Sequence, residues 1–153
     1  MARCPPLDLN SVYLYLLLTE HFPDTCILAE DRDGLLGMVS AYRPPDRDDT
    51  LFIWQVAVDP RARGRGLGLE MLLGLLARRS SRPVRWVETT VGPGNRASRR
   101  LFSRLAACLD APLGETALFD AALFGAQAHE AEPLLRIGPF TPPVLETDRF
   151  HAQ

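Results

Sequence analysis

The chain has 153 residues, 46% of them hydrophobic and 24% charged, which is the composition of one ordinary globular domain. Its formal net charge of −2 gives no general attraction to nucleic acid or to an anionic membrane surface. All 17 basic residues are arginine, which excludes chemistry through a lysine amine. The three scattered cysteines, Cys4, Cys26 and Cys108, match neither a disulfide framework nor a zinc site, so we expect no metal and a cytoplasmic location.

Four elements are predicted in the first part of the chain. They are a helix over residues 11–22, strands over 25–30 and 35–42, and a further strand over 51–58. Asn10 or Ser11 can cap the helix, and Asp33-Gly34 is a hairpin turn signal between the first two strands. The third strand is apolar on both faces, which is typical of a central strand in a covered sheet.

The second part of the chain is predicted to alternate between helices and strands. Its elements are a helix over residues 67–79, a strand over 84–91, a helix from Asn95 to about Leu109, and strands over 113–119 and 134–137. This order predicts a mixed α/β domain with antiparallel pairs and a parallel crossover at its centre. Residues 141–153 contain little apolar material, so we expect a loose tail after a single domain over residues 1–140.

A loop rich in glycine and arginine, Arg61–Gly68 with the sequence RARGRGLG, joins the third strand to the second helix. Its glycines allow backbone amides to turn inward, and the helix start adds unpaired amides and the positive end of a dipole. The arginines at positions 61, 63 and 65 add positive charge. The loop therefore predicts a pyrophosphate cradle of the kind that coenzyme A needs. An ordinary turn with the same composition is the alternative, because the dinucleotide and P-loop fingerprints both fail here.

Several blocks of sequence resemble a known family. The V-A-V-D-P strand end, the R-x-x-G-x-G loop and the helix at Asn95 resemble the GNAT superfamily of acetyl-CoA-dependent N-acetyltransferases. Within it, the blocks LDLNSVY, VSAYRPP, DTLFIWQVAVDP, ETTV, NRASRRLF and RIGPF resemble the L-2,4-diaminobutyrate acetyltransferases, over about residues 6–140. The resemblance implies the GNAT fold, with a central mixed sheet flanked by helices. It also implies transfer of an acetyl group from acetyl-CoA to the γ-amine of diaminobutyrate on the way to ectoine.

One departure from the family concerns the start of the chain. Family members usually carry a further segment before the LDLNS block, and that segment holds the first strand of the sheet. Without it, we expect the strand over residues 25–30 to be an exposed edge. A start further upstream, cover by another chain and an impaired copy are the three explanations, and we favour the first. The open edge and the tail also favour a homodimer. From the net charge we expect no nucleic-acid or membrane partner.

The resemblance places the cofactor on three parts of the chain. Backbone groups of Val56 and Val58 are expected to face the pantetheine arm, where their strand splays from its neighbour at a bulge. Asn95 is expected near the same arm, and a simple helix cap is an equal interpretation of this residue. The pyrophosphate is expected on Arg63, Gly64, Arg65, Gly66, Leu67 and Gly68.

The acceptor has a carboxylate, an ammonium and a reacting amine, so its site needs acidic groups and hydrogen-bond donors. Asp8 is predicted to bind the acceptor, with a helix-terminal charge as the alternative. Trp54 is either a core residue or a wall of the amine site. Glu88 is a candidate water-linked base on a central strand, and Thr90 is a candidate contact for the carboxylate.

Two further groups of residues are assigned to the same site. His129, Glu130 and Glu132 precede the last strand and resemble the family's substrate loop, although a solvated charge cluster is the ordinary interpretation. The tyrosine that protonates the leaving thiolate in many GNAT enzymes corresponds to Phe102, which cannot donate. The proton source therefore stays open among water, a residue such as Tyr13 or Tyr15, and no donor at all. Tyr13, which lies in the matching block, is also predicted to contact the acceptor.

Two other functions remain in view. The same fold can acetylate another diamino acid or a polyamine. A non-enzymatic module that binds acyl-CoA is the second alternative, and Phe102 with the short start of the chain supports it. DNA binding is not expected, because the arginines are spread along a chain of negative net charge.

Overall fold

The structure, a computed structural model, describes residues 10–78, 82–125 and 129–144. The strands are β1 (Ile27–Asp31), β2 (Gly34–Tyr42), β3 (Thr50–Val58), β4 (Trp86–Thr90), β5 (Leu113–Phe119) and β6 (Glu132–Ile137). The helices are α1 (Val12–His21), α2 (Leu67–Leu76) and α3 (Arg96–Cys108), with the 3₁₀ helices η1 (Pro23–Thr25), η2 (Pro60–Ala62) and η3 (Ala121–Phe124). Within these ranges no helix is long and apolar enough to cross a membrane.

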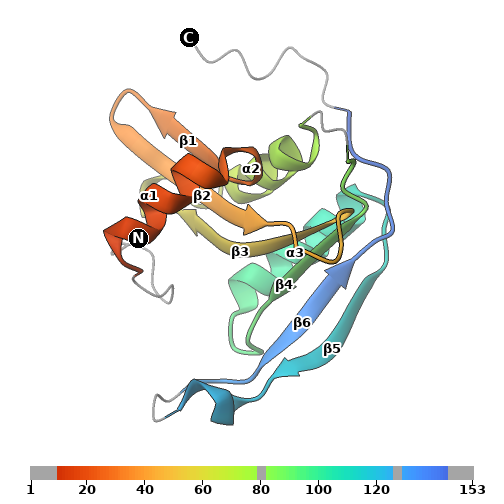
Figure 1. Cartoon of the computed structure of the whole chain (residues 1–153). Helices are drawn as coiled ribbons and strands as arrows, with labels where there is room; N and C mark the ends of the chain where they lie inside the picture. The colour runs from red at the N-terminus through yellow and green to blue at the C-terminus, as the bar shows by residue number, and fades with distance from the viewer. Residues whose placement is uncertain (1–9, 79–81, 126–128, 145–153) are drawn as a thin grey trace.

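The six strands form one sheet in the order β1-β2-β3-β4-β6-β5. All neighbouring strands are antiparallel except β3 and β4, which are parallel and joined through α2. Figure 1 shows α1 in front of the sheet and α2 and α3 behind it. The predicted mixed sheet with a parallel crossover at its centre is confirmed. The insertion of β6 between β4 and β5 was not predicted, because strand order depends on long-range pairing.

The predicted caps agree with the structure, and several predicted boundaries do not. Ser11 caps α1 by accepting a hydrogen bond at Oγ from the Leu14 amide, at 3.2 Å. β1 begins two residues later than predicted because Thr25 belongs to η1, where its hydroxyl donates to the Ala41 carbonyl at 2.6 Å. α2 ends at Leu76 rather than at residue 79, and β4 begins at Trp86 rather than at residue 84.

The hydrophobic core lies between the sheet and the pair α2 and α3. Leu72 of α2 and Leu105 of α3 are fully buried, as are Val39 and Val87 of the sheet. Removing a leucine side chain from water contributes about 1.5–3 kcal/mol to folding. This layer therefore fixes the two helices whose first turns face the site.

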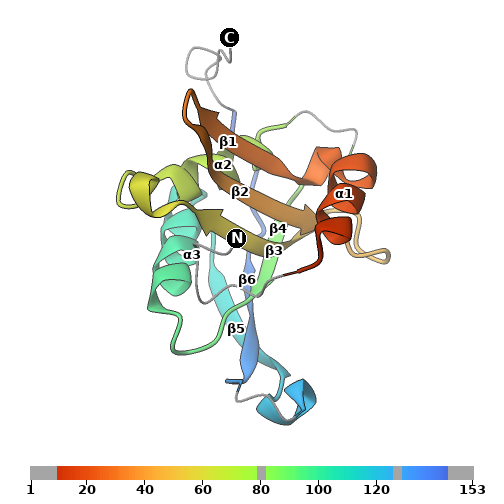
Figure 2. The ribbon, with the colours of Figure 1, turned by 90° about the vertical axis from the view of Figure 1, so that its left-hand side faces the viewer.

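Two irregularities of β3 shape the centre of the sheet. β3 and β4 pair only from Thr50 to Phe52, and β3 then continues alone on that side (Figure 2). On its other side, Ser40 of β2 pairs with Gln55 and Ala41 pairs with Ile53, so Trp54 is the extra residue of a bulge. The splayed strand and the bulge predicted by the resemblance are therefore both present. A β-bulge bends its strand and redirects the side chains near it.

The prediction that β3 is covered on both faces was wrong at one position. Trp54, the extra residue of the bulge, is 42% exposed. β1 lies at one edge of the sheet, as expected from the sequence, and β5 lies at the other edge with all seven residues exposed. The end of the predicted tail, residues 145–153, lies outside the described residues.

Replacing Leu72 by alanine tests the core. We expect a loss of about 2–5 kcal/mol in the free energy of unfolding, measured by urea denaturation, because the residue is 0% exposed and its removal leaves a cavity. The matched control is Leu16→Ala on α1, where the side chain is 60% exposed and the loss should be small. Equal losses for both variants would contradict this account of the core.

Candidate active site

A cleft of about 480 Å³ lies where β3 has separated from β4. The end of β3, the glycine loop, the start of α2 and the exposed side of α3 enclose it. Its lining includes Val56, Val58, Gly66, Asn95, Leu101 and Arg104. The structure therefore brings the three predicted parts of the cofactor site together around one cleft.

The glycine loop presents unpaired backbone donors at this cleft. Gly64 and Gly66 have φ values of 76° and 86°, which favour glycine because a Cβ atom is strained there. Gly66 caps α2, and its carbonyl accepts from the amides of Leu69 and Glu70. No amide from residue 64 to residue 68 has a hydrogen-bond partner among the described residues. These amides and the start of α2 form an anion site of the kind that binds a pyrophosphate.

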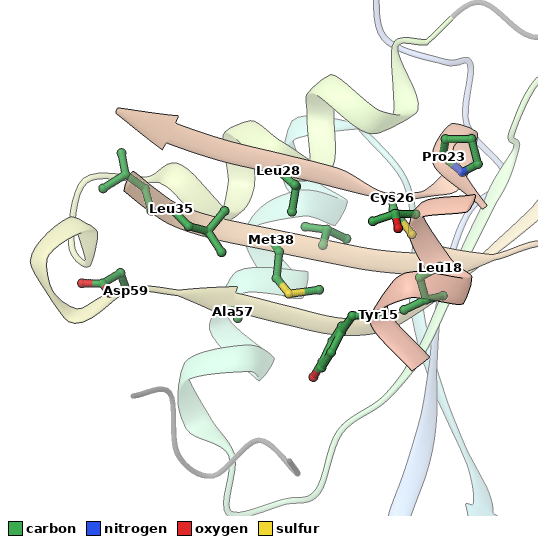
Figure 3. A pocket seen from close by; sticks show the side chains of 13 residues that line it. Tyr15, Leu18, Pro23, Cys26, Leu28, Leu35, Met38, Ala57 and Asp59 are labelled. Atoms are coloured by element: carbon green, nitrogen blue, oxygen red, sulfur yellow. The ribbon is translucent and has the colours of Figure 1, made fainter. Parts of the chain in front are cut away.

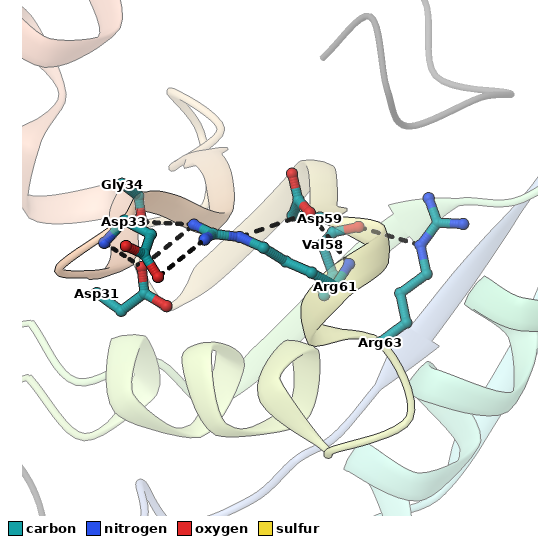
Figure 4. A network of polar contacts seen from close by, with 7 residues as sticks. All are labelled: Asp31, Asp33, Gly34, Val58, Asp59, Arg61 and Arg63. Carbon is teal, nitrogen blue, oxygen red and sulfur yellow. Dashed lines mark hydrogen bonds and ion pairs between the residues drawn. The ribbon is translucent and has the colours of Figure 1, made fainter.

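Arg61 does not contribute mobile charge to the cleft, contrary to the prediction from sequence. Its Nη2 donates to Asp31 Oδ1 at 3.2 Å and to the Gly34 carbonyl at 3.1 Å, and its Nε lies 3.8 Å from Asp59 Oδ1 (Figure 4). Asp33 is a third acidic neighbour, with its Oδ2 3.9 Å from Nη1 of Arg61. Arg61 therefore ties the beginning of the glycine loop to the β1–β2 turn.

Arg63, in contrast, lies beside the cleft. Its Nε donates to the Val58 carbonyl at 3.1 Å, and Figure 4 shows the end of its guanidinium pointing away from the Arg61 network. The carbonyl of Val58 is thus occupied in this structure, whereas Val56 pairs with Val39 on the β2 side. Arg63 and both valines line the same cleft.

The residues of α3 behave in two ways. Asn95 caps the helix, since its Oδ1 accepts from the Ser98 amide at 3.1 Å, and it also lines the cleft. The two interpretations of Asn95 are therefore compatible. Phe102 is 2% exposed and belongs to the hydrophobic core, so this position supplies no proton.

Of the acceptor residues predicted on α1 and β3, Tyr13 lies on the helix in front of the sheet, and Trp54 is the extra residue of the bulge. Trp54 is half exposed at the bulge, which favours a wall of the site over a core residue. Tyr13 is 68% exposed, whereas Tyr15 is partly buried and its hydroxyl has no partner within the described chain. The two tyrosines thus face different surroundings, as their spacing on a helix requires. Asp8 lies outside the described residues.

The predicted substrate loop is held against the end of β4. Glu132 Oε2 accepts from the Thr90 hydroxyl at 2.5 Å, and Glu130 Oε2 accepts from the Gly94 amide at 2.8 Å. Gly94 allows this approach, because a Cβ atom there would lie 2.7 Å from Glu130 Oε1. His129 stacks on the ring of Phe124, with the two ring centroids 3.9 Å apart. The loop is therefore an ordered acidic group next to the cleft.

Glu88 has partners that the sequence did not reveal. It is 1% exposed, and both of its carboxylate oxygens accept from Arg47 Nη1, at 2.7 and 2.8 Å. Arg136 Nε lies 3.2 Å from Oε1, and the Arg136 guanidinium lies 3.9 Å from the ring centroid of Trp86. The carboxylate therefore holds two arginines, and its role as a water-linked base stays a prediction.

A second and larger cavity, of about 610 Å³, lies between α1 and the strands β1, β2 and β3. Figure 3 shows Tyr15, Leu18, Leu28 and Met38 around it. Its lining is mostly apolar and offers no row of donors for a phosphate. The smaller cleft is therefore the better candidate for the cofactor site.

Comparison with known proteins agrees with this arrangement. Residues 2–107 match the family model described as Acetyltransferase (GNAT) family. The chain therefore belongs to the GNAT family of acetyltransferases.

The relatives narrow the family further. The chain is 55% identical over 144 residues to the L-2,4-diaminobutyric acid acetyltransferase of Bordetella parapertussis, covering 94% of this chain and 77% of that protein. The corresponding enzyme of Methylotuvimicrobium alcaliphilum is 47% identical over 92% of this chain and 81% of its own length. The structure of diaminobutyrate acetyltransferase EctA from Paenibacillus lautus, in complex with L-2,4-diaminobutyric acid and coenzyme A, superposes with a TM-score of 0.84. It is 44% identical over 91% of this chain and 84% of that one. Within the GNAT family, the chain belongs to the L-2,4-diaminobutyric acid acetyltransferases.

Replacing Arg61 by glutamine tests the tie between the glycine loop and the β1–β2 turn. We expect the KM for acetyl-CoA to rise about 3- to 10-fold, since a network of partly exposed ion pairs contributes on the order of 1 kcal/mol. The KM for the amine should stay within about two-fold, because none of the residues predicted to bind the acceptor takes part in the tie. The control is Arg32→Gln in the same turn, and an unchanged KM for acetyl-CoA in Arg61→Gln would contradict the proposed tie.

Proposed function

We propose that the protein transfers the acetyl group of acetyl-CoA to the γ-amine of L-2,4-diaminobutyrate, giving the N-γ-acetyl product used in ectoine biosynthesis. The observation that carries this proposal is the pairing of two sites across the splayed strands. Behind the sheet lie unpaired amides suited to a pyrophosphate, and at the end of β4 lies an acidic loop suited to ammonium groups. The relatives named above act on the same amino acid.

The reaction needs the two substrates to meet at the gap between β3 and β4. The neutral γ-nitrogen attacks the thioester carbon and forms a tetrahedral oxyanion, which collapses as the carbon–sulfur bond breaks. The nitrogen loses a proton, and the coenzyme A thiolate leaves and gains one. Since β4 does not pair with β3 beyond Phe52, backbone groups near Val56 are free on that side to contact the thioester and its oxyanion.

The acceptor end supplies orientation. We propose that Glu130 and Glu132 hold an ammonium group and that the exposed ring of Trp54 limits the volume around the reacting amine; the position of the two carboxylates at the end of β4 and the exposure of Trp54 support this. The Thr90 hydroxyl donates its one hydrogen bond to Glu132, so toward an ammonium it can only accept. Phe102 cannot protonate the thiolate, and we propose water as the proton source.

Two alternative functions make different predictions. Another diamino acid or a polyamine would use the same cleft and the same acidic loop. A module that only binds acyl-CoA would use the cleft alone. We propose one acetyltransferase domain over residues 1–140, because all six described strands belong to one sheet and α2 and α3 pack on that sheet in one core. We also propose a cytoplasmic location, where acetyl-CoA is available and where the free thiols of Cys26 and Cys108 stay reduced.

A thiol-release assay with acetyl-CoA tests the activity. L-2,4-diaminobutyrate, ornithine, lysine and spermidine are compared at equal concentrations, and NMR identifies the acetylated nitrogen. We expect turnover selective for diaminobutyrate with the acetyl group on the γ-nitrogen. Faster turnover of another amine would assign a different substrate, and acetyl-CoA binding without turnover of any amine would favour the binding module.

The variant Glu132→Gln tests the acidic loop. A hydrogen bond to a charged group contributes about 1.5–3 kcal/mol, so we expect kcat/KM for diaminobutyrate to fall about 10- to 100-fold. The KM for acetyl-CoA should not change, because the loop is separate from the glycine loop. Glu30→Gln on β1 is the control. If both variants retain full activity, the acidic loop does not bind the acceptor.

We also propose a homodimer in which a second copy of the chain covers the β1 edge. Leu28 is 57% exposed and Leu35 is 47% exposed beside the apolar cavity of Figure 3, and β1 is an open edge of the sheet. Light scattering should give twice the monomer mass. Leu28→Glu should lower that mass, whereas the control Leu123→Glu on η3 should not. A monomer at all concentrations would exclude the dimer.

A further inference from the structure

The Glu88 cluster has the composition of an anion site. One buried carboxylate faces the guanidinium groups of Arg47 and Arg136, so the three side chains carry a net charge of +1. Asp46 is a weak fourth member, since it is 80% exposed and 3.7 Å from Arg47. One arginine would be enough to neutralise the carboxylate of Glu88, so the second arginine gives the cluster its positive charge.

The two arginines also keep donors free. Their side chains are 42% and 43% exposed, whereas that of Glu88 is 2% exposed. Arg47 uses only Nη1 for its hydrogen bonds, and the terminal nitrogens of Arg136 have no hydrogen-bond partner among the described residues. Trp86 supports the Arg136 guanidinium from below. Glu88 and Trp86 therefore fix two guanidiniums whose remaining donors face outward.

The cluster lies on the same face of the sheet as the acceptor residues. Side chains alternate along β4, so Glu88 and Thr90 share a face, and their Cα atoms lie about 6.6 Å apart. Phe52 of β3 and Arg136 of β6 are the neighbours of Glu88 in the sheet. The face thus has a basic end at the arginines and an acidic end at Thr90 and Glu132.

We infer that Arg47 and Arg136, held by Glu88, bind the α-carboxylate of the acceptor. This inference rests on the proposed function, since it concerns the same site. A diamino acid carries a carboxylate at one end and amines toward the other, which matches the two ends of the face. Thr90 cannot donate to the carboxylate while its hydroxyl donates to Glu132, and planar guanidiniums bind carboxylates through paired hydrogen bonds. The arginines therefore select a diamino acid over a simple diamine.

The test compares L-2,4-diaminobutyrate with 1,3-diaminopropane, which has the same two amines and lacks the carboxylate. The variants are Arg47→Gln, Arg136→Gln and Arg136→Lys, and the control is Arg82→Gln, whose side chain pairs with the exposed Asp48 at 2.7 Å. Glu88→Gln tests the positioning role of the carboxylate. Initial rates give kcat and KM for each amine and for acetyl-CoA, and thermal unfolding shows that each variant is folded.

We expect the wild-type protein to prefer diaminobutyrate over diaminopropane. In both glutamine variants the KM for diaminobutyrate should rise about 10- to 100-fold, as for the loss of a charge-assisted pair. The kinetic constants for diaminopropane and the KM for acetyl-CoA should stay within about two-fold. Arg136→Lys should recover only part of the preference, because a lysine amine cannot form the paired contact.

Three outcomes would overturn the inference or its premise. An unchanged preference for diaminobutyrate in both glutamine variants would show that the arginines do not bind the carboxylate. Equal losses for both amines would show that the cluster only supports the fold. If Arg136→Gln does not fold, Arg47→Gln alone tests whether the arginines bind the carboxylate. Arg47 lies in the loop before β3, where a substitution disturbs the sheet less than one within β6. A wild-type protein without activity on diaminobutyrate would refute the proposed function instead.

Discussion

The short pairing between β3 and β4 is the constraint on which the rest of the structure depends. Only three residues of β3 pair with β4 before the strands diverge. A sheet that separates at its centre leaves backbone groups without partners, and such groups are costly unless a ligand or water satisfies them. The core under α2 and α3 packs against both β3 and β4. Val56 and Val58, which lie on β3 beyond this pairing, line the cleft behind the sheet.

The local features that create this gap could be predicted from the sequence, whereas its charged surroundings could not. The glycine loop, the Asn95 cap and the end of β3 at Val58 are each formed by residues that neighbour one another in the chain, so periodicity and turn chemistry were sufficient to predict them. The ion pairs of Arg61 with Asp31 and Asp33, and those of Glu88 with Arg47 and Arg136, join residues 28 or more positions apart. Such contacts follow from strand order, and the placement of β6 beside β4 brings Arg136 to Glu88.

All basic residues of the chain are arginine, so residue type alone could not tell their roles apart. The arginine side chain serves three purposes here. Arg61 braces a turn, Arg63 lies at the phosphate cleft, and Arg47 and Arg136 lie over a buried carboxylate. The neighbouring acids make the difference. The charge of Arg61 is neutralised by the three aspartates around it. The two arginines at Glu88 share one carboxylate, so a net positive charge remains there.

The bulge at Trp54 and the stacking of Arg136 on Trp86 have a spectroscopic consequence. These are the only two tryptophans of the chain. Trp54 is the extra residue of the β3 bulge, and Trp86 lies on β4 against the Arg136 guanidinium. One indole is half exposed at a bulge, and the other lies under a cation that perturbs its π-system. The intrinsic emission of the protein therefore originates at the bulge and at the Glu88 cluster. Binding of an acceptor at the carboxylate site that we propose should change this emission, without a label and without turnover.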